Sequence, residues 1–299
     1  MRVDVIHLGR IDAGTLQGSR HATERAFAAW RRLRASAWAA RVYHCPMPLH
    51  LYILTGASRG MGLAMAQQLL QPGHALVCMA RNASPALQAP AGATLAQWTL
   101  DLADGAPAAR RLADWLQAQP AGAYASATLI NNAGVIPRIA PLAQCADAEG
   151  LAGLAHALRV GLEAPMQLTA AFLAATEGWA VPRKVLNISS GLGRRAMASQ
   201  SAYCAAKAGL DHFTRCLALD EAAKPHGAKV CSLAPGVIDT GMQVQLRGAD
   251  HAAFPDQPNF AQLQATGMLT APHDAAARVL AWLQRPDFGA EPVADVRQP

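Results

Sequence analysis

This 299-residue sequence has no long apolar runs and no paired cysteines. It contains no run of about 18 apolar residues, which argues against a membrane-spanning helix. Its six cysteines are scattered and form no C-x-x-C pair. Scattered cysteines are typical of reduced thiols rather than of a disulfide or zinc framework. We therefore expect a cytoplasmic protein that binds neither a membrane nor a metal.

Positive charge is also scarce once the N-terminal segment is set aside. The formal net charge is +6, but residues 1–46 hold eight arginines against three acidic residues, which leaves 18 basic and 17 acidic residues in 47–299. Nucleic-acid binding needs a basic surface that neutralises phosphates. A nearly neutral body gives no support for a nucleic-acid partner.

Residues 1–46 differ from the rest of the chain in composition. They are rich in Arg and Ala and lack the 7–15-residue apolar core of a secretory signal, although an organellar transit peptide fits the composition. The segment "MPLHLYILTGASRG" from Met47 has the form in which a nucleotide-binding fold begins. We interpret 1–46 as an N-terminal extension, disordered or arising from a misassigned start, and 47–299 as one folded domain.

From Met47 onward, short apolar runs alternate with longer helical segments. The pattern predicts strands near 49–56, 74–81, 93–102, 125–134, 183–191, 228–236 and, at an edge, 291–296. Helices are expected over 62–71, 106–119, 150–177, 200–223 and 273–284, and a long loop over 241–272. This alternation predicts an α/β, Rossmann-type, doubly wound parallel sheet. Long loops of this kind often act as lids or binding elements.

The segment "TGASRGMG" (55–62) joins the first expected strand to the first helix. Gly56, Gly60 and Gly62 would allow a tight turn and a close approach of the backbone to a pyrophosphate. The helix N-terminus would then offer free N–H groups to that anion. An ordinary strand–helix loop would not need three glycines, so the segment predicts a dinucleotide site.

Two arginines suggest which dinucleotide binds. Arg59 lies inside the glycine segment, and Arg81 follows the second strand, where an acid would select NAD. Two guanidiniums suit the additional 2′-phosphate of NADP. Either arginine could instead be an ordinary solvated residue, but the two together favour NADP(H).

A phenol and an ammonium share one face of the expected helix 200–223. Tyr203 and Lys207 are four residues apart and project to the same side. A nearby ammonium favours phenolate and lowers the pKa of a tyrosine, which is ordinarily near 10. Considered alone, the pair is better explained by a tyrosine at a helix-packing surface with an extended lysine beside it.

Further motifs make the sequence resemble the short-chain dehydrogenase/reductase family over nearly all of 47–299. "NNAG" (131–134), "NISS" (187–190), "YCAAK" (203–207) and "PGVIDT" (235–240) occur in the family's order and spacing. The resemblance implies cofactor contacts at Gly56, Ser58, Arg59, Gly60, Met61, Gly62, Arg81, Asn82, Asp101, Leu102, Asn132, Ala133, Gly134, Tyr203, Lys207, Pro235, Gly236, Val237 and Thr240.

The resemblance also implies a mechanism. Ser190 would polarise a substrate carbonyl, Tyr203 would donate a proton as hydride arrives from NADPH, and Lys207 would lower the tyrosine pKa and hold the nicotinamide ribose. It further implies a homodimer or homotetramer, in which helices 150–177 and 200–223 pack against a partner.

Within this family, the segments "ARN" (80–82) and "APGVIDTGMQVQLR" (234–247) are similar to the sepiapterin and benzil reductase branch. That similarity implies reduction of a ketone or vicinal diketone. In the pterin-reducing members an acid near the C-terminus anchors the pterin, and Asp295 is the nearest match.

The sequence departs from the family pattern at Gly161, which stands where a catalytic Asn usually supports a proton relay. A water or a neighbouring polar group could take its place, and His156 and Glu163 are candidates by proximity in sequence, although the spacing supports neither. The departure allows a second hypothesis, a cofactor-binding sensor or scaffold without catalysis. The presence of Ser190, Tyr203 and Lys207 argues against that alternative.

Overall fold

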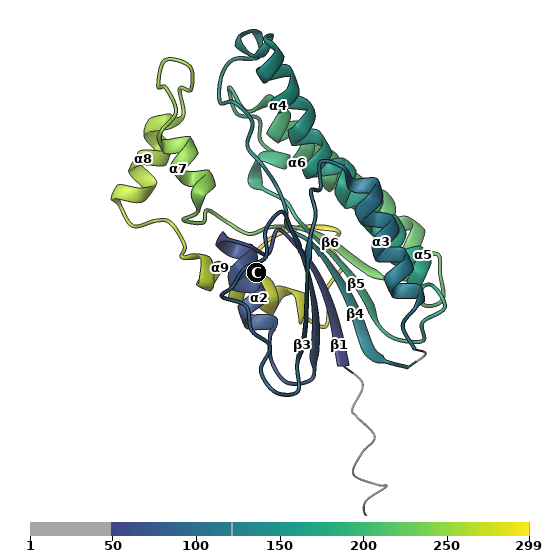
Figure 1. Ribbon diagram of the computed structural model, residues 1–299. Coiled ribbons are helices and arrows are strands. Elements are labelled where there is room, and N and C mark those ends of the chain that lie inside the picture. The colour runs from purple at the N-terminus through teal and green to yellow at the C-terminus, as the bar shows by residue number, and fades with distance from the viewer. Residues whose placement is uncertain (1–48, 121, 299) are drawn as a thin grey trace, which may run out of the picture. The chain divides into compact units, whose positions relative to one another are not determined.

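Seven parallel strands form the centre of the computed structural model, which describes residues 49–120 and 122–298 (Figure 1). They are β1 (Leu49–Thr55), β2 (His74–Ala80), β3 (Thr94–Thr99), β4 (Tyr124–Asn131), β5 (Arg183–Ile188), β6 (Lys229–Ala234) and β7 (Val293–Asp295). Their order in the sheet is β3-β2-β1-β4-β5-β6-β7, and every neighbouring pair is parallel. The predicted N-terminal extension lies outside the described residues.

Strand β1 shows why the sheet is buried on both faces. Successive side chains of a strand point to opposite faces. Leu51 and Ile53 pack in one apolar cluster with Phe172, whereas Leu54 packs in a second cluster with Met65 on the other face. Each face therefore needs its own layer of helices, as expected for a parallel sheet.

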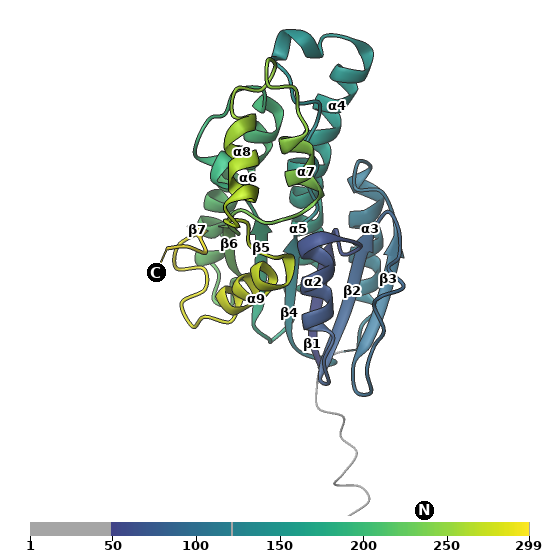
Figure 2. The same cartoon turned by 90° about the vertical axis from the view of Figure 1, so that its left-hand side faces the viewer.

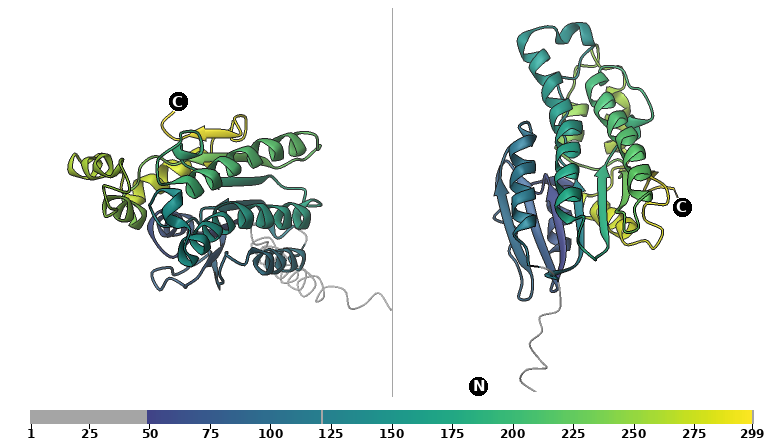
Figure 3. Two further views of the ribbon diagram at one scale, coloured as in Figure 1. Left: turned by 90° about the horizontal axis from the view of Figure 1, so that it is seen from above. Right: turned by 90° about the vertical axis from the view of Figure 1, so that its right-hand side faces the viewer.

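The helices divide between these two faces. Helices α2 (Gly60–Leu69) and α9 (Pro272–Leu283) cover one face, as Figure 2 shows from the front. Helices α3 (Gly105–Gln117), α5 (Ala164–Thr176) and α6 (Ser201–Ala222) cover the other, which faces the viewer in the right-hand panel of Figure 3. The predicted doubly wound α/β fold is confirmed. No helix within the described ranges is long and apolar enough to cross a membrane.

Two predictions of local structure were wrong. The helix expected over 150–177 is divided into α4 (Ala148–Leu158) and α5 by a π-helical turn, η2 (Arg159–Glu163), which contains Gly161. The loop expected over 241–272 contains two helices, α7 (Gly241–Arg247) and α8 (Gln257–Ala265). In Figures 1 and 2, α4, α7 and α8 all extend beyond the carboxyl ends of the strands.

Candidate functional site

The motifs identified in the sequence meet at the carboxyl edge of the sheet. The glycine segment follows β1, Arg81 follows β2, Asp101 follows β3, and the segments starting at Asn132, Ser190 and Pro235 follow β4, β5 and β6. The chain reverses its direction of winding between β1 and β4, which are neighbours in the sheet. Ligands of open α/β sheets bind at such a switch point.

The glycine segment forms a backbone cradle at the start of α2. Gly56 and Gly60 adopt φ values of +70° and +55°, in the left-handed region that favours glycine. A Cβ on Gly62 would clash with the carbonyl oxygen of Gly56. The N-cap residue Arg59 gives α2 no side-chain cap, so its first N–H groups are available to an anion. Ser58 is half-buried and Met61 is buried within this segment. The cradle fits the pyrophosphate of a dinucleotide.

Asn132 ties the cradle to the end of β4. Its backbone N–H donates to Thr55 Oγ1 at 2.9 Å, and its side-chain amide donates to the Thr55 carbonyl at 3.0 Å. The Ala133 N–H donates to the same hydroxyl at 3.0 Å. A Cβ on Gly134 would lie 3.7 Å from Lys207 Nζ, so this loop runs from the cradle to the lysine.

The candidate cofactor-selecting residues lie in the segments that follow β1, β2 and β3. Arg59 and Arg81 are exposed, and neither lies within ion-pair distance of a carboxylate belonging to residues 49–120 or 122–298. Asn82 and Asp101 are also exposed, whereas Leu102 is buried. Arg59 is the N-cap residue of α2 and Arg81 directly follows β2, the strand paired with β1, so both exposed arginines lie at the carboxyl edge of the sheet.

The segment after β6 forms the opposite wall. Gly236 has φ +85°, and the Val237 carbonyl accepts a hydrogen bond from Thr270 N–H at 2.9 Å. Pro235, Gly236, Val237 and Thr240 are all half-buried. A Cβ on Gly60 would lie 3.4 Å from Thr240 Cγ2, so this segment faces the glycine cradle directly.

Ser190, Tyr203 and Lys207 come together between β5 and α6. Ser190 lies beside the Tyr203 side chain, and its Oγ accepts a hydrogen bond from Leu192 N–H at 3.2 Å. Lys207 is buried and donates from Nζ to the Ile188 carbonyl at 2.7 Å, and its Nζ lies 5.8 Å from the centre of the Tyr203 ring. The Ser190 hydroxyl, the Tyr203 phenol and the Lys207 ammonium therefore lie close together beside the loop at Gly134.

Burial governs the acidity of this pair. Burial raises the pKa of Tyr203, and the neighbouring Ser190 hydroxyl offsets this rise only in part. Burial lowers the pKa of Lys207 to about 8, against the raising effect of Asp211. The net shift of the tyrosine pKa is upward, because desolvation has the largest effect on it. A phenol with a raised pKa is protonated at neutral pH, as a proton donor must be.

A buried polar network that the sequence analysis missed supports these elements. Asn131 donates to Thr169 Oγ1 at 3.1 Å and to Asn187 Oδ1 at 2.8 Å, and Asn187 donates to Thr214 Oγ1 at 2.9 Å. The network joins β4 and β5 to α5 and α6. Polar residues inside otherwise apolar strands were the only signal that could have indicated it.

The position of the absent relay residue is tightly packed. Gly161 is buried, and a Cβ on it would lie 3.1 Å from Ala206 Cβ on α6. Glu163 is exposed and accepts a hydrogen bond from Gln167 at 3.0 Å, so it does not replace the relay side chain. π-Helical turns often occur at functional sites.

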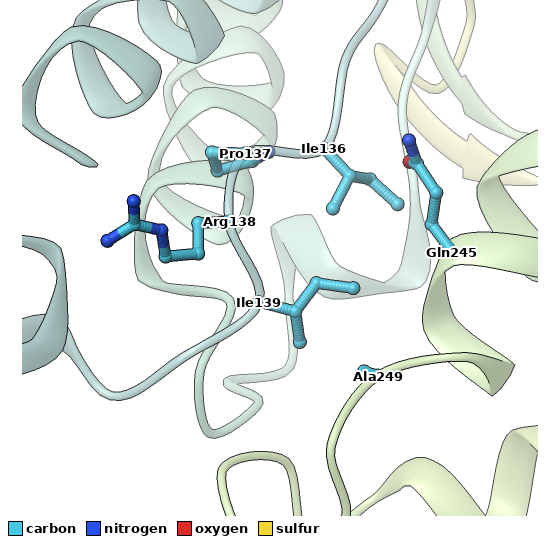
Figure 4. A pocket seen from close by; sticks show the side chains of 6 residues that line it. All are labelled: Ile136, Pro137, Arg138, Ile139, Gln245 and Ala249. Carbon is cyan, nitrogen blue, oxygen red and sulfur yellow. The ribbon is translucent and has the colours of Figure 1, made fainter. Parts of the chain in front are cut away.

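An open pocket of about 340 Å³ lies between the loop after β4 and α7. Its lining residues are Ile136, Pro137, Arg138, Ile139, Gln245 and Ala249 (Figure 4). The Arg138 side chain extends away from Gln245 and Ala249 and forms ion pairs with Asp147 at 2.6 Å and Glu149 at 2.9 Å. Gly134, two residues before Ile136, lies beside both Lys207 and Met242 of α7.

Asp295 does not face this pocket as a free anchor. Its carboxylate accepts hydrogen bonds from Arg297 at 2.6 and 2.8 Å and lies 3.9 Å from Arg194 Nη2. Only 6% of the residue is exposed. Its role as a pterin anchor, inferred from the C-terminal likeness, has no support in this geometry.

Comparisons with known proteins agree with this geometry. Residues 50–251 match the family described as short chain dehydrogenase. A benzil reductase ((S)-benzoin forming) from Bacillus cereus is 33% identical over 239 residues, covering 79% of this chain and 94% of that protein. A sepiapterin reductase from Xenopus tropicalis is 32% identical over 211 residues, 66% of this chain and 77% of that protein. A crystal structure of a short-chain dehydrogenase/reductase from Burkholderia vietnamiensis, 36% identical, superposes with a TM-score of 0.57 and covers 84% of this chain and 99% of that one.

Proposed function

The chain belongs to the short-chain dehydrogenase family, and from this premise we propose that it is an NADPH-dependent reductase of a ketone or vicinal diketone. The observation that carries the proposal is the convergence of Ser190, Tyr203 and Lys207 at the carboxyl edge of the sheet. The family uses NAD(H) or NADP(H), and the glycine cradle after β1 fits such a cofactor.

In this proposal, NADPH supplies a hydride to the carbonyl carbon when it is bound. The chain's own residues then handle the oxygen. Ser190 donates a hydrogen bond to the carbonyl oxygen, which stabilises the negative charge that develops there. Tyr203 transfers its phenolic proton to that oxygen, so that the product is an alcohol. The Lys207 ammonium stabilises the phenolate left on Tyr203.

The preference for NADPH rests on Arg59 and Arg81. Both guanidiniums are exposed at the ends of adjacent strands, where a 2′-phosphate on the adenosine ribose would accept charge-assisted hydrogen bonds. No acidic residue directly follows β2, where an acid would favour the free 2′-hydroxyl of NADH.

The pocket beside α7 favours an apolar neutral substrate over a pterin. Ile136, Pro137 and Ile139 supply its apolar wall, and Arg138 is engaged by Asp147 and Glu149. A pterin has several polar groups, and among these lining residues only Gln245 offers an uncharged polar side chain to bind them. Since Asp295 is also engaged, we propose an aromatic diketone such as benzil rather than sepiapterin.

The test is NADPH oxidation with benzil, phenylpropanedione and sepiapterin, each alongside the Tyr203→Phe variant. We expect turnover of the aromatic diketones by the unaltered protein and a large loss in the variant. NADPH binding without turnover of any carbonyl would instead support a sensor or scaffold, the alternative suggested by Gly161.

A further inference from the structure

A buried carboxylate, Asp211, lies on the Tyr203–Lys207 face of α6, one turn beyond the lysine. Asp211 is 1% exposed, and its Oδ1 accepts a hydrogen bond from Ser232 Oγ at 2.7 Å. Its Oδ2 has no hydrogen-bond partner among the residues that the structure describes. A buried carboxylate with an unsatisfied oxygen is costly. Its presence here therefore needs a physical explanation.

Arg194 is the cation nearest to that oxygen. Its Nε lies 4.0 Å from Asp211 Oδ2, and its Nη1 donates to the Ala294 carbonyl at 3.4 Å. Its Nη2 lies 3.9 Å from Asp295 Oδ2. Arg194 follows Ser190 by four residues, directly after the short helix Gly191–Gly193. Its guanidinium thus connects the segment that holds Ser190 to both α6 and β7.

Gly193, next to Arg194 in the chain, packs closely against both Asp211 and the backbone of Lys207. A Cβ on Gly193 would lie 2.7 Å from Asp211 Oδ2 and 3.0 Å from the Lys207 carbonyl oxygen, so a larger residue there would push the two segments apart. The titratable or charged groups that face Asp211 are Lys207 on α6, Cys231 on β6 and Arg194. Tyr203 lies beyond Lys207, and Asp295 on β7 lies beyond Arg194.

We propose that the buried Asp211 and the partly exposed Arg194 form a charge pair that sets the charge around Lys207 and holds the Ser190 segment against α6. Asp211 is then a positioning residue that acts through Lys207 and never touches the substrate. The inference rests on the proposed role of Lys207 in the reductase, but its central statement concerns the lysine's charge and is measurable without turnover.

The two members of the pair act on Lys207 with opposite sign. Removing the Asp211 charge takes away an anion that favours the ammonium, so the pKa of Lys207 falls below its value of about 8. Removing Arg194 takes away a cation and leaves Asp211 free to act on Lys207, so the same pKa rises. Simple disruption of the fold would not produce opposite shifts.

The experiment uses the full-length protein with ¹³C-labelled lysine. The chain has only four lysines, Lys184, Lys207, Lys224 and Lys229, so each side-chain resonance is assignable from single Lys→Arg variants. The Lys207 signal is titrated with pH in the unaltered protein, in Asp211→Asn and in Arg194→Met. Asp220→Asn is the matched control, because Asp220 is exposed near the end of the same helix.

We expect the Lys207 titration midpoint to fall by about 0.5 to 1 pH unit in Asp211→Asn, because the variant lacks the Coulomb attraction of one nearby negative charge. It should rise in Arg194→Met, stay near the original value in Arg194→Lys, and stay unchanged in Asp220→Asn. Where benzil is reduced, the loss of kcat/KM at high pH should move in the same direction as the midpoint.

An unchanged midpoint in Asp211→Asn, or shifts of the same sign in Asp211→Asn and Arg194→Met, would overturn the inference. If Asp211→Asn does not fold, the contrast between Arg194→Met and Arg194→Lys decides alone, and equal midpoints in those two reject the pair. Absence of carbonyl reduction with the expected opposite shifts would reject the proposed function while the charge pair stands.

Discussion

Gly161 in the π-helical turn lies directly against Ala206 of α6, where a Cβ on the glycine would sit 3.1 Å from the alanine Cβ. An added Cβ would therefore be closer to Ala206 than ordinary van der Waals packing allows. The contact places the position of the missing relay residue one residue away from Lys207 along α6. A side chain introduced at 161 therefore requires Ala206 on α6 to shift by a few tenths of an ångström.

The first prediction concerns restoration of the relay at this contact. Gly161→Asn should lower the midpoint of thermal unfolding, because overpacking costs about 1 to 3 kcal/mol and exceeds the gain of about 1 kcal/mol from removing a helical glycine. Gly161→Asn combined with Ala206→Gly should recover part of that loss. Measured against Ala206→Gly alone, the double variant should show higher turnover. Equal turnover would show that the relay does not need this side chain.

The second prediction concerns pH. As the pH rises through about 8, Lys207 loses its proton, so kcat/KM for carbonyl reduction should decline from that pH upward. Tyr203 has a pKa raised by burial and stays protonated over this range. Lys207→Arg should move the decline to higher pH, whereas Lys224→Arg should not. A decline that begins only above pH 10 would assign it to the tyrosine instead.

The third prediction concerns the choice of cofactor. Arg81→Asp should raise KM for NADPH by roughly 10- to 100-fold, the equivalent of one lost charge-assisted contact of about 1.5 to 3 kcal/mol. The new acid should improve the use of NADH. Arg110→Asp on the exposed surface of α3 is the control for the change of charge. Unchanged KM values for both cofactors would contradict the role of Arg81.

The fourth prediction concerns the glycine cradle. Gly62→Ala places a methyl group against the Gly56 carbonyl oxygen, which is backbone and cannot move aside without shifting α2. We expect a loss of about 2 to 4 kcal/mol in the free energy of unfolding and weaker binding of NADPH. Gly178→Ala is the matched control, because a Cβ there meets nothing within 4 Å. Equal stability of the two variants would show that the turn is more flexible than its geometry indicates.

The fifth prediction concerns the substrate wall. Ile139→Ala should lower kcat/KM for benzil by roughly 5- to 30-fold, from about 1 to 2 kcal/mol of lost apolar contact. Butane-2,3-dione is too small to fill the same space and should be affected less. Leu142→Ala, at an exposed residue three positions further along, is the control. A similar loss with both diketones would place the substrate elsewhere.

Local sequence patterns predicted most of the elements of the fold because their signals are short in range. Strand β1 alternates its side chains between two apolar clusters, and α2 follows three glycines that allow the turn. The break at η2 was not predicted, because a single glycine, Gly161, weakens a helix without specifying a π-helical turn. Helices α7 and α8 were also missed, since α8 has no buried residue and thus no clear apolar stripe.

The sequence by itself determined the order of the motifs, the pairing of Tyr203 with Lys207 on one helical face, and the fold class, because all of these follow from backbone periodicity. Only the tertiary structure decided the acidity of that pair, since burial shifts a pKa according to surroundings that come from β5 and from the loop after β4. The same holds for Asp295, which the sequence suggested as a pterin anchor but which is bound to Arg297 and approached by Arg194. Desolvation and ion pairing depend on residues distant in sequence, and folding brings them together.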